Sequence, residues 1–313
     1  MQRYTKDEVL AKALYGEVIA ATDTVTGRKV AVKCMELAAA TNRTSLQGVP
    51  IAEDISMERE VNRAVSQGHG HPHIMRLLDD FEEGGMGYFV FEYCAGGELF
   101  QHPLPMDLAT TIKYFRQIVH AVVFLHGRGY AHRDISLENV LLDGHGNTKL
   151  CDFGLATELD ERSTHIVGKA FYMAPEMYLR YGYEPAPVDV WALGIMLLII
   201  LTGAPPFARA NDSDKVFVFV KVHGIASVLR AWKVLHLIPP IALDLLEKML
   251  VVDPTKRLTI QDVMAHPFLK EPVQVVTRGR KRMIVRKWLT KMRRRIHQMM
   301  RNVFPKTPAV VAM

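Results

Sequence analysis

The sequence predicts an α+β fold of two lobes, a small β-rich lobe followed by a larger helical one. Strand-like apolar runs occupy 4–35, and a second strand pair ends at 88–93. A glycine-containing connector, 94–97, follows them, and beyond it the apolar spacing becomes helical. We therefore expect lobes at 4–94 and 95–270, with a ligand-binding cleft between them.

The small lobe is expected to contain a hairpin and one helix. Val18-Ile19-Ala20 and Val30-Ala31-Val32 lie on either side of the turn signal Thr26-Gly27. Residues 38–52 are small and polar and predict a loop, whereas 53–66 has apolar residues at helical spacing.

The large lobe is expected to be helical. Its longest apolar stretch, from Val190 to Leu201, is interrupted by Gly194. Because this stretch is too short to span a bilayer, it predicts a buried helix. The expected helices are 107–126, 187–201, 215–230 and 240–250.

Composition excludes several classes of protein. With 49% hydrophobic and 23% charged residues, the chain falls outside the disordered class. Three scattered cysteines cannot form a disulfide framework, which indicates a reducing compartment. No basic-then-apolar leader opens the sequence, so we expect a cytoplasmic protein.

Positive charge is concentrated in a tail. Residues 271–313 hold twelve Lys or Arg and one acid, a net charge of +11, whereas the 270 residues before them carry −5. Over 280–304, apolar residues recur every three or four positions between basic ones. Such an amphipathic helix binds calmodulin-like partners, lies on anionic membranes, acts as a localisation signal or packs on its own domain. The tail leaves the nucleus and a membrane surface open as locations, and we expect no specific nucleic-acid target.

Lys33 is the first candidate functional residue. It ends the run Val30-Ala31-Val32-Lys33 on an apolar strand, where a lysine is costly unless an anion pairs with it. A helical acid about 25 residues later would complete an ion pair. We choose Glu60, which directly precedes Val61 on the expected buried face, and keep Glu58 as the alternative.

Two further motifs carry oxygen-bearing side chains. His132-Arg133-Asp134 is followed by Asn139, and Asp152-Phe153-Gly154 comes thirteen residues later, beyond an expected hairpin at 143–147. Asp134 would orient a hydroxyl and accept its proton, while Asn139 and Asp152 would bind Mg²⁺, a hard ion that prefers oxygen ligands. Placed cations, a carboxylate near the nucleophile and metal ligands are what phosphoryl transfer requires.

In this order and spacing, and with Ala174-Pro175-Glu176 closing the segment, the motifs resemble a eukaryotic protein kinase domain over 4–269. The resemblance is to the calcium/calmodulin-dependent group and, through Met173 to Glu176, to serine/threonine rather than tyrosine kinases. It implies a two-lobed kinase fold, with ATP and Mg²⁺ used to phosphorylate Ser or Thr hydroxyls of proteins. It also implies that Asp189 ties down the catalytic loop and that Arg257 pairs with Glu176.

The resemblance also implies a nucleotide site. Phe91 would be the gatekeeper, the backbones of Glu92 and Cys94 would bind adenine, and Glu98 would bind the ribose. The other positions that would surround the nucleotide are Leu10, Ala13, Gly16, Val18, Ala31, Lys33, Leu141 and Asp152.

The glycine-rich loop departs from the family pattern. The pattern G-x-G-x-x-G-x-V falls on residues 11–18, where Ala11 and Ala13 replace the first two glycines and only Gly16 remains. Two methyl groups would lie where bare backbone normally covers the phosphates, which predicts weaker nucleotide binding. A non-catalytic pseudokinase that acts as a scaffold or allosteric partner is the alternative.

A second departure involves two residues. The family usually has lysine at the position of Ser136 and threonine at the position of Lys169, so hydroxyl and ammonium are exchanged. We hypothesise that Lys169 returns the cation to the γ-phosphate from the opposite side, with Ser136 as its hydrogen-bond partner. Two independent losses in an inactive protein are the alternative.

Several residues bear on regulation and on the choice of substrate. Arg133 indicates regulation by phosphorylation of the activation segment, with Thr164 as the preferred acceptor and Ser163 and Thr157 next; an unmodified polar loop is the alternative. Glu98 and Glu138 fall where similar kinases read a basic residue upstream of the acceptor, so we expect substrates with such residues.

Overall fold

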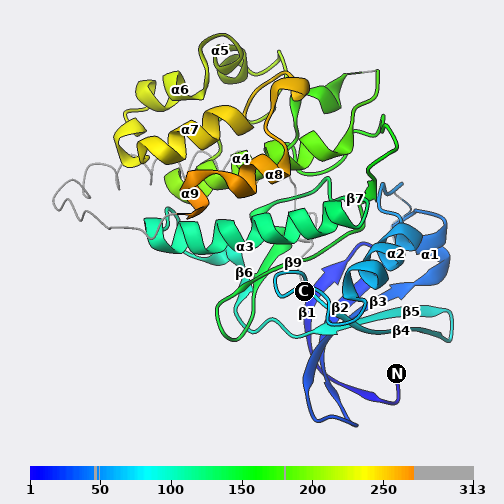
Figure 1. Ribbon diagram of the computed structural model, residues 1–313. Coiled ribbons are helices and arrows are strands. Elements are labelled where there is room, and N and C mark those ends of the chain that lie inside the picture. Colours follow the sequence, from blue (N-terminus) through cyan, green and yellow to red (C-terminus); the bar gives the residue numbers. More distant parts are fainter. Residues whose placement is uncertain (46–47, 49, 180, 271–313) are drawn as a thin grey trace.

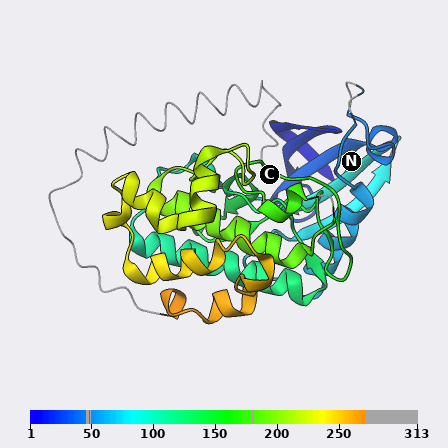
Figure 2. The ribbon, with the colours of Figure 1, turned by 90° about the horizontal axis from the view of Figure 1, so that it is seen from above.

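The computed structural model describes residues 1–45, 48, 50–179 and 181–270. The basic tail, including the amphipathic segment 280–304, lies outside them. The described chain has two lobes, an antiparallel sheet below and a helical body above (Figure 1), as the sequence predicts. Seen from above, the two lobes again lie side by side (Figure 2).

The five-stranded sheet of the small lobe has the order β1-β2-β3-β5-β4, with all neighbours antiparallel. β3 is central and buries every residue from Val30 to Met35, in agreement with its apolar sequence. The predicted hairpin of β2 and β3 is confirmed. The strands are β1 (Tyr4–Ala13), β2 (Gly16–Asp23), β3 (Lys29–Glu36), β4 (Leu77–Glu83) and β5 (Met86–Glu92).

Two helices complete the small lobe. α2 (Ile55–Ser66) begins after Asp54, whose carboxylate accepts hydrogen bonds from the first free N–H groups of the helix. The prediction of a loop over 38–52 is partly wrong, because α1 (Leu37–Thr41) overlaps it. Three consecutive alanines follow Leu37, and alanine has the strongest helix propensity.

The large lobe is built around α4 (Pro185–Thr202). A proline occupies its first position, and Gly203 ends it in the left-handed conformation. Among the described residues, α4 is the one helix with the length and composition of a membrane span, but 89% of it is buried in the protein. It packs on α3 (Leu108–Gly127), α7 (Pro240–Met249) and α8 (Ile260–Ala265), so the predicted buried helix is confirmed.

The helix expected over residues 215–230 is divided into two helices in the structure. The sequence predicts a continuous helix over 215–230, but Gly224, with φ of +74°, separates α5 (Lys215–His223) from α6 (Ile225–Ala231). Glycine adopts this conformation without the steric cost that a side chain would add. A last short helix, α9 (Pro267–Lys270), ends the described chain.

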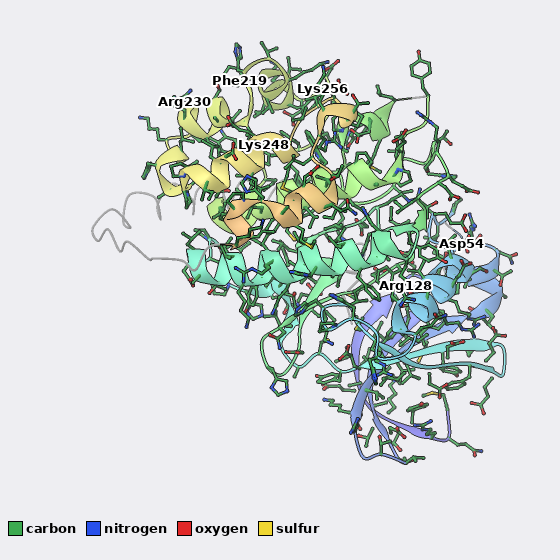
Figure 3. The ribbon with its side chains drawn as sticks, in the orientation of Figure 1. Asp54, Arg128, Phe219, Arg230, Lys248 and Lys256 are labelled. Atoms are coloured by element: carbon green, nitrogen blue, oxygen red, sulfur yellow. The ribbon has the colours of Figure 1, made fainter. Side chains whose placement is uncertain are left out.

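Short strands lie where the lobes meet. β6 (Gly97–Glu98), β8 (Val140–Leu142) and β9 (Thr148–Leu150) form one sheet, and β7 (Tyr130–Ala131) pairs with β10 (Thr157–Glu158). Arg128, at the end of α3, donates to the carbonyl oxygen of Ala64 in α2 at 2.9 Å, and Figure 3 labels Arg128 and Asp54 beside α2 at this junction. The loops between these strands carry the candidate site.

Candidate active site

Lys33 lies in the middle of β3 and pairs with a carboxylate from α2. Its Nζ is 2.6 Å from Oε1 of Glu58, and the two side chains are 8% and 1% exposed. Burial disfavours the ammonium, but the carboxylates of Glu58 and Asp152 outweigh it, so the pKa of Lys33 lies above its ordinary value. The pair fixes a cation within electrostatic reach of Asp152.

The choice of Glu60 as the partner of Lys33 is wrong, and the alternative, Glu58, is correct. Glu60 is exposed and accepts a hydrogen bond from the Tyr130 hydroxyl at 2.6 Å. The buried face of α2 includes Glu58, Val61 and Val65, which are three and four residues apart. Glu60 is two residues from Glu58 and therefore projects from another side of the helix.

The loop that carries His132-Arg133-Asp134 is fixed by Asp189, a buried carboxylate of α4. Its Oδ2 and Oδ1 accept the backbone N–H groups of His132 and Arg133, each at 2.8 Å, and the His126 ring is 2.8 Å from Oδ2. Burial favours the neutral acid, but these contacts hold the pKa of Asp189 below its usual range. Since Arg133 has φ of +62°, the loop needs such support.

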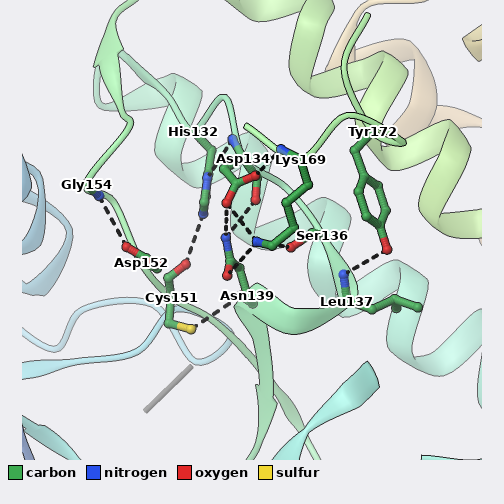
Figure 4. Close-up of polar contacts among 10 residues, drawn as sticks. All are labelled: His132, Asp134, Ser136, Leu137, Asn139, Cys151, Asp152, Gly154, Lys169 and Tyr172. Atoms are coloured by element: carbon green, nitrogen blue, oxygen red, sulfur yellow. Dashed lines mark hydrogen bonds and ion pairs between the residues drawn. The ribbon is translucent and has the colours of Figure 1, made fainter. Parts of the chain in front are cut away.

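Three polar side chains form a hydrogen-bonded cluster with Asp134 (Figure 4). Nδ2 of Asn139 donates to Asp134 Oδ2 at 2.7 Å. Nζ of Lys169 is 2.8 Å from the same oxygen, 3.0 Å from Ser136 Oγ and 3.3 Å from Asn139 Oδ1. Burial opposes the ammonium, but the acids Asp134 and Glu138 outweigh it and raise the pKa of Lys169. The structure therefore brings both members of the exchanged pair, Ser136 and Lys169, into one cluster with Asp134.

Asp152 follows β9 and has φ of +67°. Phe153 is fully buried, and its ring centroid is 5.3 Å from that of His132, which ties the two motifs together. No three His, Cys, Asp or Glu side chains of the described ranges form a metal centre of their own. The side-chain oxygens of Asn139 and Asp152 would suit Mg²⁺, a hard ion that prefers oxygen ligands.

The segment that corresponds to the glycine-rich loop is a paired hairpin. β1 and β2 pair as far as Ala13 and Gly16, with register shifts before Glu8 and before Ala11, and only Leu14-Tyr15 form the turn. Gly16 is required, because a Cβ there would lie 2.2 Å from the carbonyl oxygen of Cys34. The Tyr15 side chain is nearly buried, and its hydroxyl donates to the Glu53 carbonyl at 3.2 Å. Strand pairing and a buried tyrosine hold this hairpin.

The other predicted nucleotide-binding positions lie along the junction of the lobes. Ala31 and Phe91 are register partners on β3 and β5. The Glu92 carboxylate binds Lys149 at 2.7 Å, so its side chain is engaged elsewhere. Burial raises the pKa of Glu98. Buried positions are Val18, Ala31, Phe91, Cys94, Glu98 and Leu141, and partly buried ones are Leu10, Ala13, Gly16 and Glu92. Their contact with a nucleotide stays a prediction.

Residues 4–269 match the family described as protein kinase domain. The chain belongs to the protein kinase family. It is 32% identical to maternal embryonic leucine zipper kinase of Xenopus tropicalis over 279 residues, which cover 87% of this chain and 40% of that protein. It is 33% identical to CBL-interacting protein kinase 29 of Oryza sativa subsp. japonica over 282 residues, 86% of this chain and 60% of that protein. It is 32% identical to CBL-interacting serine/threonine-protein kinase 12 of Arabidopsis thaliana over 276 residues, 86% of this chain and 53% of that protein.

These kinases belong to the calcium/calmodulin-dependent group, which confirms the resemblance that the sequence indicates. The chain spans between 40% and 60% of the length of the three relatives. The similarity therefore concerns the kinase domain, and the rest of each relative lies outside the alignment.

The end of the activation segment is anchored by a second buried ion pair. Nη2 of Arg257 is 2.9 Å from Oε2 of Glu176, and Nη1 contacts Oε1 of the same carboxylate. The two side chains are 0% and 6% exposed. The pairing that the kinase resemblance implies is therefore present, and the segment from Asp152 to Glu176 is fixed at its C-terminal end.

Glu53 is a residue of the kinase site that the sequence analysis did not identify. A Cβ placed on Gly154 would lie 3.0 Å from its Cγ, and the next N–H, of Asp54, donates to the Gly154 carbonyl at 2.9 Å. Burial and the nearby Asp152 raise the pKa of Glu53 to about 8. The sequence predicts a helix from residue 53, but the capping signal of Asp54 places Glu53 before the helix and beside the site.

Proposed function

We propose that this chain is an active protein serine/threonine kinase that transfers the γ-phosphoryl group of ATP to Ser or Thr hydroxyls of proteins. Its family uses ATP and Mg²⁺, and the relatives are protein kinases by name. The observation that carries the proposal is the convergence of Lys169, Asn139 and Ser136 on Asp134. A scaffold would not need these side chains, so the arrangement favours catalysis over a pseudokinase.

Asp134 is suited to accept the proton of the substrate hydroxyl. Its Oδ1 accepts the backbone N–H of Lys169 at 3.0 Å, and its Oδ2 contacts Asn139 and the Lys169 ammonium. The carboxylate is thus oriented before a substrate binds, which lowers the cost of reaching the transition state. Mg²⁺ held by Asn139 and Asp152 would supply charge neutralisation at the phosphates.

Two lysines, Lys33 and Lys169, are proposed to bind different phosphates of ATP. Lys33, held by Glu58, is suited to the α- and β-phosphates, as in related kinases. Lys169 is proposed to serve the γ-phosphate in place of the lysine that the family has at Ser136. The connected cluster supports one exchange rather than two losses, because a buried ammonium without these partners would be costly.

Substrates with basic residues upstream of the acceptor are part of the proposal. Glu98 and Glu138 each have one buried carboxylate oxygen without a hydrogen-bond partner within residues 1–45, 48, 50–179 and 181–270. An unpaired buried carboxylate oxygen is costly. A guanidinium or ammonium group of the substrate could donate the hydrogen bonds that these two oxygens lack.

For the tail we propose a calmodulin-like partner, with an anionic membrane as the alternative ligand of 280–304. Two of the relatives are described as CBL-interacting kinases, which supports a protein partner here. Calcium-dependent pull-down and co-sedimentation with anionic vesicles separate the two. A cytoplasmic location, with the nucleus or a membrane surface as alternatives, is likewise proposed and would be checked by cell fractionation.

The activity test measures transfer from radiolabelled ATP to peptides that carry Ser or Thr after basic residues. Asp134→Asn and Asp152→Ala should each lower the rate about a thousandfold or more, since each removes a part on which transfer depends. Asp212→Asn, on the surface near α5, is the matched control and should keep the wild-type rate. Equal labelling by wild type and Asp152→Ala would contradict the proposal.

A further inference from the structure

Arg133, beside the catalytic aspartate, has neutral partners. Its Nε donates to the Leu155 carbonyl at 2.7 Å, Nη2 to the Ala156 carbonyl at 3.3 Å, and Nη1 to the Ser163 hydroxyl oxygen at 2.8 Å. None of the ion pairs formed by the described part of the chain includes Arg133. A hydroxyl and two carbonyls therefore satisfy a guanidinium that would otherwise attract an anion such as a phosphate.

Ser163 is built into this contact. It is 6% exposed, and it exchanges two backbone hydrogen bonds with Tyr183, at 2.9 and 2.8 Å. Its Oγ also accepts the N–H of His165 at 3.3 Å, and the Tyr183 hydroxyl donates to the His165 carbonyl at 2.7 Å. Because Ser163 is nearly buried, a phosphate on it would require this bridge to open.

The rest of the activation segment is held by backbone contacts with neighbouring elements. β10 pairs with β7, and the N–H of Leu159 donates to the Gly129 carbonyl at 2.8 Å. Gly168, with φ of +92°, approaches the carbonyl oxygen of Arg133, where a Cβ would lie 2.7 Å away. The following residue is Lys169, which binds Asp134. Arg133 therefore links Ser163 to the catalytic cluster.

We propose that unphosphorylated Ser163 is the positioning residue that holds Arg133 and the activation segment in the catalytic arrangement, so that this kinase acts without phosphorylation of that segment. The proposal rests on the proposed function, since it concerns how that same site is kept active. Thr164 is exposed, and a phosphate on it would meet an Arg133 that is already engaged.

The kinetic test uses the full chain after phosphatase treatment, the double variant Thr157→Ala/Thr164→Ala, and Ser163→Ala. Mass spectrometry after each assay verifies that residues 152–176 carry no phosphate. The treated protein and the double variant should keep kcat within about twofold, because neither change touches the Arg133 contacts. Ser163→Ala should lower kcat about tenfold, with the KM for ATP changed less than about twofold, because it removes a hydrogen bond to a charged group.

A Ser163→Thr variant retains the hydroxyl and should recover about half or more of the lost kcat, which a purely structural role for a small side chain would not explain. The proposal is overturned by a kcat that drops about tenfold on phosphatase treatment, or by a Ser163→Ala variant with wild-type kcat.

Hydrogen exchange tests the same point without relying on activity. The backbone amides of Ser163 and Tyr183 should be protected in the dephosphorylated chain and exchange about tenfold faster in Ser163→Ala, whereas Thr164→Ala leaves them unchanged. Rapid exchange at both amides in the dephosphorylated wild type would contradict the proposal. A chain that never transfers phosphate would contradict the proposed function instead, and the exchange result would still decide the role of Ser163.

Discussion

The catalytic loop and the β1–β2 hairpin both depart from the kinase pattern, but they do so differently. In the catalytic loop the missing lysine is matched by Lys169, whose Nζ lies 3.0 Å from the substituting Ser136. In the hairpin two family glycines are replaced by alanines, and residues 1–15 contain no glycine. Instead, Ala13 pairs with Gly16 and Tyr15 is buried against the small lobe.

The difference reflects what each region contributes to the reaction. A cation at the transferred phosphate lowers the activation barrier of phosphoryl transfer directly. If that cation is lost, another must replace it to keep the rate. Glycines in the hairpin contribute bare backbone and freedom of movement, and their replacement by alanine adds two methyl groups but removes no charge from the reaction. We therefore expect large effects at the catalytic loop and small ones at the hairpin.

The largest effect is expected for Lys169→Thr. This variant removes the cation from Asp134 and, if our proposal holds, from the γ-phosphate, so kcat should fall about a hundredfold to a thousandfold, comparable to the loss of one oxyanion-hole donor. Steady-state kinetics with saturating Mg²⁺-ATP measure it. Lys221→Thr, which removes an exposed lysine that pairs with Asp212 outside the Asp134 cluster, is the control and should stay within about threefold. If Lys169→Thr were as fast as this control, the catalytic loop would be no more sensitive to substitution than the β1–β2 hairpin, which would contradict the comparison.

Next in size is Glu58→Ala. It leaves Lys33 as an unpaired buried charge, so the free energy of unfolding should fall by about 3 kcal/mol and the KM for ATP should rise. Chemical denaturation and ATP titration measure the two effects. Glu60→Ala, two residues away and exposed, should change the stability by less than about 0.5–1 kcal/mol. If both variants lost the same free energy of unfolding, the net charge of α2, and not the Lys33–Glu58 pair, would account for the effect.

A smaller effect is expected for Tyr15→Phe. The change removes one hydrogen bond, to the Glu53 carbonyl, and should cost about 1 kcal/mol. Because the hairpin covers the nucleotide site in this family, the KM for ATP should rise about threefold to fivefold, with kcat nearly unchanged. Tyr181→Phe, on a side chain that is 89% exposed, is the matched control. Kinetics that show kcat falling instead would assign Tyr15 to the chemical step.

The smallest effect is expected where a family glycine is restored. Ala13→Gly should change the KM for ATP by less than about threefold and lower stability by about 0.5–1 kcal/mol, because glycine weakens a paired strand. ATP titration and thermal unfolding test this. A KM that falls tenfold or more would mean that the alanine methyl, and not the pairing, limits nucleotide binding.

Much of the site could be predicted from sequence because its motifs are short. Asp134 and Asn139 lie five residues apart on one loop, so their meeting needs no knowledge of distant packing. The partner of Lys33 could not be fixed this way, because choosing between Glu58 and Glu60 requires the helical register set by the Asp54 cap and by packing on the sheet.

Tertiary packing accounts for the other differences. Glu53 enters the site only because its segment lies against Gly154, a contact between residues about a hundred positions apart in the sequence. Gly224 divides the predicted helix at 215–230 because its φ of +74° suits a turn, whereas an isolated glycine in a helical pattern is not by itself a break.

A double-mutant cycle on the exchanged pair tests the central claim most directly. It measures kcat for the full chain and for Ser136→Lys, Lys169→Thr and the combination of both. If Lys169 does the work of the family lysine, the combined variant should exceed Lys169→Thr alone by about tenfold or more, a difference of about 1.4 kcal/mol in activation free energy, whereas Ser136→Lys alone should bring no such gain. A combined variant no faster than Lys169→Thr would show that the two substitutions are independent and that the charge was not relocated.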